Sequence, residues 1–161
     1  PDVLPYTYER RVEKVVVRLA GEVAEIREMF YRVLRVFASR LIEKRLVFGR
    51  SEKSLSQFAV LQARTQFRQN PPADIPPHLY GMYEGDFAAC ITLYHALELL
   101  TTQGLKPFHE FVQAVASENK VTGRAKHELL RNADWMELNQ RLTDLFAPDR
   151  GFVMGHPKLL H

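Results

Sequence analysis

With 161 residues, of which 46% are apolar and 11% aromatic, the chain is long enough for one domain with a substantial core, and this composition excludes a disordered polar chain. No run approaches the roughly 20 consecutive apolar residues that a membrane span needs, and the first residues lack the layout of a signal peptide, so we expect a soluble protein with no membrane partner. A single cysteine, Cys90, excludes an internal disulfide, and its apolar surroundings favour a packing role over a reactive one.

The net charge of +3 is unevenly distributed along the chain. Residues 1–70 carry fourteen Lys and Arg against eight Asp and Glu, residues 71–104 carry none against four, and residues 105–161 carry eight against seven. Positive charge on both flanks of the middle segment permits contact with a polyanion on one face. A basic surface that only maintains solubility is the alternative.

The residues predict an extended opening segment. Residues 1–8 are rich in proline and tyrosine, and the run Val15-Val16-Val17 within residues 9–19 is typical of a strand. One strand is not stable alone, and no convincing second strand follows. We therefore expect this strand to lie against the helices or to join a sheet formed outside the chain.

Over residues 21–48 the apolar period becomes that of a helix, with Gly49 as its predicted end. Two interpretations of its basic end at Arg40, Lys44 and Arg45 remain open: pairing with the helix dipole, or contact with a ligand. The predicted buried stripe consists of Val23, Ile26, Phe30, Val33, Leu34, Phe37 and Leu41.

Residues 54–70 predict a second helix, capped by Ser51 or Ser54 and ending before two prolines. Arg64 and Arg68 are four residues apart and share one face of this helix. They form either a basic ledge for phosphates or an ordinary solvated face.

The segment 84–104 predicts a helix that is apolar on nearly every side, which places it at the centre of the fold. Asp86 suits its first turn, and Gly104 suits its C-cap because glycine adopts positive φ readily. Further helices are predicted over residues 107–117 and 134–146, and residues 151–161 return to an extended run.

The densest basic segment lies where a polar loop leads into a helix near Gly123. It carries Lys120, Arg124, Lys126 and Arg131. Exposed cations beside a helix start suit phosphate, because free backbone N–H groups add to the side chains. An ordinary solvated loop is the alternative.

We find no catalytic motif in the sequence. There is no phosphate-binding glycine loop, no paired CxxC, no HExxH and no nucleophile elbow. His95, with Glu98 and Cys90 nearby in the chain, lacks further ligands at metal-binding spacing, so a core histidine is favoured over a metal ligand. Acting alone, this chain is not expected to be an enzyme.

Several segments together resemble one known family. Three of them are Pro1-Asp-Val-Leu-Pro-Tyr6 leading into Arg11-Val-Glu-Lys-Val-Val-Val-Arg-Leu19, Tyr83-Glu-Gly-Asp-Phe-Ala-Ala-Cys-Ile-Thr-Leu-Tyr-His-Ala-Leu-Glu-Leu-Leu100, and Gly155-His-Pro-Lys-Leu159. In this order they are similar to the insert between the two motor lobes of the FANCM/Hef family of superfamily 2 DNA helicases and translocases. Residues 63–71 and 122–132 look closer to the Fanconi anaemia members than to the archaeal ones.

The resemblance implies a thumb-like helical insert domain over residues 21–147, with residues 1–20 connecting it to the first motor lobe and residues 148–161 to the second. We thus expect an all-α helical bundle, with a long first helix around a buried central helix and extended, strand-like segments at both termini. ATP and magnesium would bind in the motor lobes, so this segment needs no cofactor.

The implied function is contact with branched or forked DNA in a nuclear translocase that remodels stalled forks during DNA repair. The residues expected to contact phosphates, without reading sequence, are Arg64, Arg68, Lys120, Arg124, Lys126 and Arg131. Two alternatives stay open: a surface that docks a repair protein, and a spacer that only fixes the geometry of the lobes.

Overall fold

The structure is a computed structural model that describes the backbone of residues 3–146 and the side chains of residues 20–146. Within these residues it has six α-helices, two short 3-10 helices and no strand, so the predicted all-α class is confirmed. The predicted C-terminal connection, residues 148–161, lies outside the described residues. The elements are α1 (Val3–Glu43), η1 (Glu52–Ser54), α2 (Gln57–Gln69), η2 (Pro77–Leu79), α3 (Tyr80–Gln103), α4 (Leu105–Ser117), α5 (Gly123–Arg131) and α6 (Ala133–Leu145).

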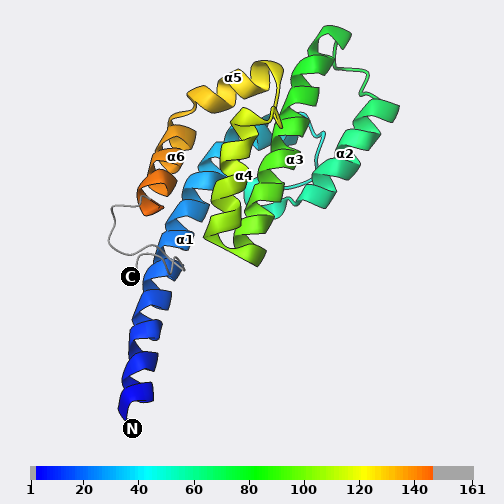
Figure 1. Ribbon diagram of the computed structural model, residues 1–161. Coiled ribbons are helices and arrows are strands. Elements are labelled where there is room, and N and C mark those ends of the chain that lie inside the picture. The colour runs from blue at the N-terminus through cyan, green and yellow to red at the C-terminus, as the bar shows by residue number, and fades with distance from the viewer. Residues whose placement is uncertain (1–2, 147–161) are drawn as a thin grey trace.

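The predicted strand over residues 9–19 is wrong, because α1 is helical from Val3 onward. A run of three valines lowers helix propensity by only a fraction of a kcal/mol per residue. Extending an established helix requires no new nucleation, and this outweighs the local preference for strand. The first part of α1 consequently extends beyond the other helices as a straight rod (Figure 1).

The predicted end of this helix at Gly49 is also wrong, since α1 ends at Glu43. Arg45 takes the left-handed conformation there, with φ of 58°. The N–H of Leu46 donates to the carbonyl of Leu41 at 2.8 Å, and the N–H of Arg45 donates to the carbonyl of Ile42 at 3.0 Å. This is the hydrogen-bond pattern of a Schellman cap, with arginine in the position that glycine usually holds.

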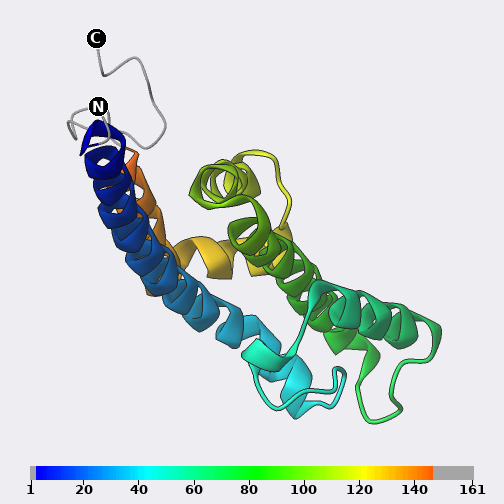
Figure 2. The ribbon, with the colours of Figure 1, turned by 90° about the horizontal axis from the view of Figure 1, so that it is seen from below.

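The central helix is α3, as predicted, although it begins at Tyr80 rather than at residue 84. It contacts α1, α2, α4 and α5, and Figure 2 shows α1 and α2 on different sides of it. Gly104 forms the predicted C-cap with φ of 97°. Cys90 is fully buried, and burial raises the pKa of its thiol, which supports the predicted packing role.

The remaining helices match their predicted ranges closely. The cap of α2 is Ser56, whose side chain accepts from the N–H of Ala59, while Ser51 caps the short helix η1 instead. α6 packs on α1, and α5 joins α6 to α3. The core is rich in fully buried phenylalanines, with the rings of Phe30 and Phe108 packed edge to face at 5.3 Å. None of the helices in the described part of the chain is both long and apolar enough to cross a bilayer.

Candidate nucleic-acid interface

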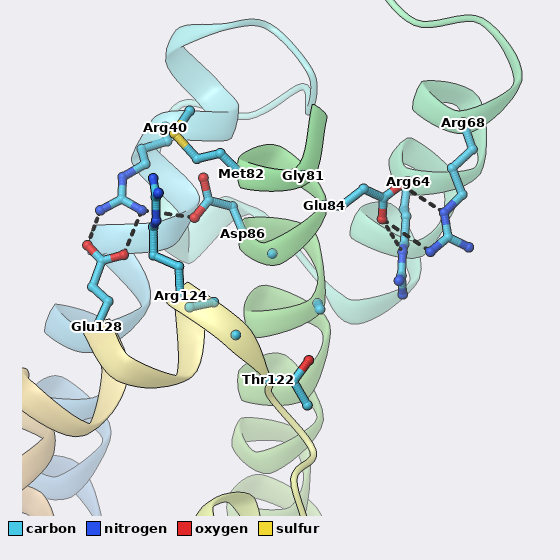
Figure 3. A pocket seen from close by; sticks show the side chains of 14 residues that line it. Arg40, Arg64, Arg68, Gly81, Met82, Glu84, Asp86, Thr122, Arg124 and Glu128 are labelled. Atoms are coloured by element: carbon cyan, nitrogen blue, oxygen red, sulfur yellow. Dashed lines mark hydrogen bonds and ion pairs between the residues drawn. The ribbon is translucent and has the colours of Figure 1, made fainter. Parts of the chain in front are cut away.

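A hollow of roughly 440 Å³ lies where the end of α1, the middle of α2 and the starts of α3 and α5 meet (Figure 3). Arg64 and Arg68 reach it from α2, and Arg124 reaches it from α5. These residues are about sixty positions apart in the chain. The fold thus brings together two of the basic segments that the sequence singled out.

The arginines on α2 share one acidic partner, Glu84 of α3. Its carboxylate accepts from Arg64 Nε at 3.2 Å, and from Arg68 Nε at 2.8 Å and Nη2 at 3.1 Å. Partial burial alone would raise the pKa of Glu84, but the bonds from Arg68 and Arg64 outweigh it and lower that pKa. Glu84 is therefore charged at neutral pH and offsets part of the positive charge of this pair.

Arg40 near the end of α1 ties α3 and α5 together. Its Nη1 donates to Asp86 Oδ1 at 2.9 Å and to Glu128 Oε1 at 2.9 Å, and its Nη2 contacts the other oxygen of Glu128. The bond to Glu128 is the main cause of the raised pKa of Arg40. For Arg40, neither dipole pairing alone nor ligand contact describes this basic helix end: the side chain bonds two carboxylates of the same chain.

Asp86 is the second acidic group of the hollow. Its predicted place in the first turn is wrong, because α3 begins at Tyr80 and Asp86 lies in the second turn. Only 2% of the residue is exposed, and its Oδ2 has no hydrogen-bond partner among the side chains and backbone that the structure describes. Burial raises the pKa of this carboxyl to about 6, although the nearby guanidinium of Arg40 acts in the opposite direction. Asp86 thus anchors Arg40 at an electrostatic cost.

The first turn of α5 forms one wall of the hollow. Gly123 has φ of 64°, and the side chain of the N-cap residue Thr122 makes no capping hydrogen bond. A methyl group at Gly85 of α3 would stand 3.4 Å from the Cβ of Ala125, so the two helices approach closely here. This contact fixes the start of α5, with exposed Arg124, against the hollow.

Arg131, at the other end of α5, lines an adjoining hollow of roughly 470 Å³ together with Arg124, Arg40 and Glu128. Neither Arg124 nor Arg131 forms an ion pair with any side chain within residues 20–146. These two arginines are therefore the cations of the site that have no acidic partner in this part of the chain.

The other two residues predicted from this segment do not line either hollow. Lys120 pairs with Glu118 at 3.3 Å, and its Nζ lies 5.2 Å from the centre of the Phe111 ring. Lys126 donates to the side chain of Asn119. The structure thus brings together Arg64, Arg68, Arg124 and Arg131, and it leaves Lys120 and Lys126 apart.

Around the two hollows five arginines face three carboxylates, because Arg40 also belongs to the group. The arrangement suits an anion, because guanidinium forks match phosphate oxygens and a helix start without a side-chain cap favours negative charge. Within the described residues no three His, Cys, Asp or Glu side chains are placed to hold a metal ion. His95 packs against the ring of Phe111 at 5.0 Å, in agreement with a packing role.

Sequence reasoning identified the cations but missed the carboxylates Glu84, Asp86 and Glu128 and the bridging role of Arg40. One signal was available: residues 71–104 carry four acidic side chains and no basic one, so their partners had to come from elsewhere in the chain.

Comparison with known families gives a match over residues 22–136 to the family described as "Putative ATP-dependent RNA helicase, helical bundle". The Fanconi anemia group M protein of Gallus gallus is 40% identical over 99% of the chain, and the homolog of Mus musculus is 39% identical over 99%. An ATP-dependent DNA helicase of Pyricularia oryzae is 28% identical, again over 99% of the chain.

The chain spans 9% of the length of each vertebrate relative and 15% of the fungal one. No solved structure matches the chain. The resemblance to the Fanconi anaemia group M helicases that the sequence motifs predicted is confirmed by these similarities.

Proposed function

Because the chain belongs to the ATP-dependent RNA helicase helical-bundle family, we propose that it is the part of a DNA-repair helicase that contacts the phosphates of branched DNA. The bundle is a helicase-associated domain and not the motor itself. Phosphate contacts position a protein without reading sequence, so the expected preference is for DNA shape. This suits a motor that remodels stalled forks of any sequence.

The convergence of Arg64 and Arg68 with Arg124 on one hollow carries this proposal. A basic surface that only maintained solubility would not require arginines from two distant segments to meet at an uncapped helix start. The site offers two unpaired guanidinium groups, two shared ones and free backbone N–H groups. Together these suit the phosphates of a DNA strand that passes over the hollow.

The rest of the parent protein enters the proposal through the relatives. Motor lobes on either side of the bundle would bind ATP and magnesium, with residues 1–20 and 148–161 as the connections to them. The parent would act in the nucleus, where its DNA substrate lies. The family description names an RNA helicase, whereas the fungal relative is named a DNA helicase, and the proposal follows the latter.

A paired variant tests the site directly. Arg124→Gln with Arg131→Gln removes two exposed, unpaired cations, so the fold should be preserved. Arg27→Gln with Lys106→Gln removes the same charge away from the hollows and serves as the control. Fluorescence anisotropy with a Y-fork should show at least tenfold weaker binding for the first pair and less than twofold for the control, and equal losses in both would refute the site.

Docking of a repair protein is a second candidate, and a hollow of roughly 600 Å³ between α2 and α3 favours it. Phe58 is 67% exposed on its rim, and Leu61 is 42% exposed. Apolar side chains left in water near a concave surface are typical of a protein contact. Binding at this surface should scarcely respond to salt, whereas phosphate binding should weaken steeply.

A further inference from the structure

We propose that Phe48, held outward by the loop between α1 and η1, stacks on an unpaired base of the branched DNA, while cations of the same loop contact its backbone. The proposal rests on the proposed function, because it assigns a binding site to the single-stranded part of the same branched DNA. The site lies on the opposite flank of α2 from the arginines described above.

Phe48 is 93% exposed, the largest exposed fraction among the large apolar side chains in the described part of the chain. Its neighbours in sequence, Leu46 and Val47, are buried at 8% and 3% exposure and anchor the loop in the core. An aromatic ring left in water directly after two anchored residues gains nothing for the fold. The exposed ring is available to a binding partner.

The loop that carries Phe48 is fixed by its backbone. The Schellman cap of α1 sets its start, and Ser54 Oγ accepts from the N–H of Arg50 at 3.1 Å and of Ser51 at 3.3 Å at its end. A Cβ at Gly49 would lie 2.8 Å from both Leu55 Cδ2 and Ser54 Oγ, so a larger residue there would have to displace these two side chains. The ring is therefore presented without the entropy cost of ordering a mobile loop on binding.

Basic residues flank Phe48 in the sequence. Lys44, Arg45 and Arg50 lie within four residues of Phe48, and all three are exposed. None of them forms an ion pair with a side chain of residues 20–146. An aromatic residue interleaved with free cations suits single-stranded nucleic acid, where bases stack on rings and phosphates follow the cations.

The space beside the ring fits a base. A hollow of roughly 550 Å³ is bounded by Phe48, the small side chains of Ala59 and Ala63, and the amides of Gln62 and Gln66. Small residues leave room for a flat ring. A glutamine amide both donates and accepts, so the rim can bond the edge of any base without selecting one.

Helix α2 separates this hollow from the arginine site. At 100° per residue, Ala59, Gln62, Ala63 and Gln66 fall on one side of the helix, and Arg64 and Arg68 fall on the opposite side. The two sites are thus about one helix diameter apart, roughly 10 Å. Such a spacing suits the branch point of a fork: the arginine site would hold phosphates on one side of α2, and the Phe48 site would hold a base of the strand that leaves the duplex on the other.

The test compares duplex, a Y-fork and a short oligothymidylate by fluorescence anisotropy. Phe48→Ala should weaken binding to the fork and the oligothymidylate about tenfold, or about 1.4 kcal/mol, which corresponds to one lost stacked base. Binding to duplex should stay the same. Phe58→Ala removes an exposed ring from a hollow that no Lys or Arg of the described residues lines, so it should leave all three DNAs bound as by the parent chain.

Two further variants separate stacking from general apolar contact. Phe48→Leu keeps an apolar side chain but loses the ring, so it should fail like the alanine variant. Phe48→Trp should keep binding, and stacking of oligothymidylate on the new ring should quench its fluorescence. The native Trp135 is only 3% exposed, so it contributes a constant background signal. Parent-like binding by the leucine variant would overturn base stacking in favour of a general apolar contact, and an alanine variant that binds every DNA like the parent would overturn the proposal outright. Duplex binding by the parent tests the arginine site separately.

Discussion

A negative side chain within a proposed phosphate site leads to an unusual expectation: Glu84→Gln should tighten DNA binding. Glu84 bonds both Arg64 and Arg68, and these bonds keep its pKa low, so it is charged at neutral pH. A phosphate on the free Nη groups of either arginine would lie roughly 7 Å from this carboxylate. At an effective dielectric constant of about 40, two like charges at that distance repel by about 1.2 kcal/mol, or about sevenfold in affinity.

Salt determines how much of this gain is visible. At physiological ionic strength the Debye length is about 8 Å, so the gain should fall to about twofold, whereas at low salt it should approach the full value. Glutamine keeps the shape of the side chain and a hydrogen-bond acceptor. The two partly exposed ion pairs that it weakens should cost no more than about 1 kcal/mol of folding free energy.

The assay is anisotropy with a fork at low and physiological salt, with circular dichroism to check the fold. Glu137→Gln is the matched control, because Glu137 is an exposed carboxylate on α6 that lines neither hollow. It should change affinity less than twofold. If a folded Glu84→Gln variant bound several-fold more weakly, Glu84 would orient the arginines rather than oppose phosphate, and if it bound like the parent, the phosphate would not lie at this hollow.

Three further expectations concern stability. The pKa of Asp86 is raised from 3.8 to about 6, so the folded chain holds this proton more tightly than the unfolded one. On going from about pH 7.5 to 4.5 the parent should therefore gain about 2 kcal/mol of unfolding free energy relative to Asp86→Asn. If urea denaturation gave the two proteins the same dependence on pH, this expectation would be contradicted. Arg45→Gly relieves a left-handed φ of 58° and should raise the free energy of unfolding in urea by about 0.5–1 kcal/mol, whereas a lowered value would show that the arginine side chain itself stabilises the loop. Cys90 is fully buried and burial raises its thiol pKa, so a thiol reagent should modify it only at the rate of unfolding, and rapid labelling of the folded chain would contradict its position.

The helices could be read from the sequence because the 3.6-residue apolar period is strong over each of them. The central position of α3 followed from apolar residues on all its sides. The strand over residues 9–19 failed because a local preference for strand was weighed without the helix that continues through it. The end of α1 was misplaced because a left-handed arginine leaves no sign in the sequence, whereas Gly49 looked like a cap.

The candidate site was predictable only in part. Spacing placed Arg64 and Arg68 on one face. The charge of the loop near Gly123 singled out four residues, of which Arg124 and Arg131 line the hollows and Lys120 and Lys126 do not. Their convergence depends on the close approach of α5 to α3 and on the bridge that Arg40 makes, which are contacts between distant segments. The exposure of Phe48 was equally hidden, since an apolar residue after a helix normally turns inward.

The salt dependence of duplex binding tests the central claim most directly, because the Phe48 loop is proposed to contact only the single-stranded part of a fork. If Arg64, Arg68, Arg124 and Arg131 each contact one phosphate, the logarithm of the association constant should fall with the logarithm of salt with a slope of about −3.6. The variant with Arg124→Gln and Arg131→Gln should give about −1.8, with the Arg27 and Lys106 control near the parent value. A parent slope near zero, or the same slope in both variants, would contradict the account of a phosphate-binding helicase bundle.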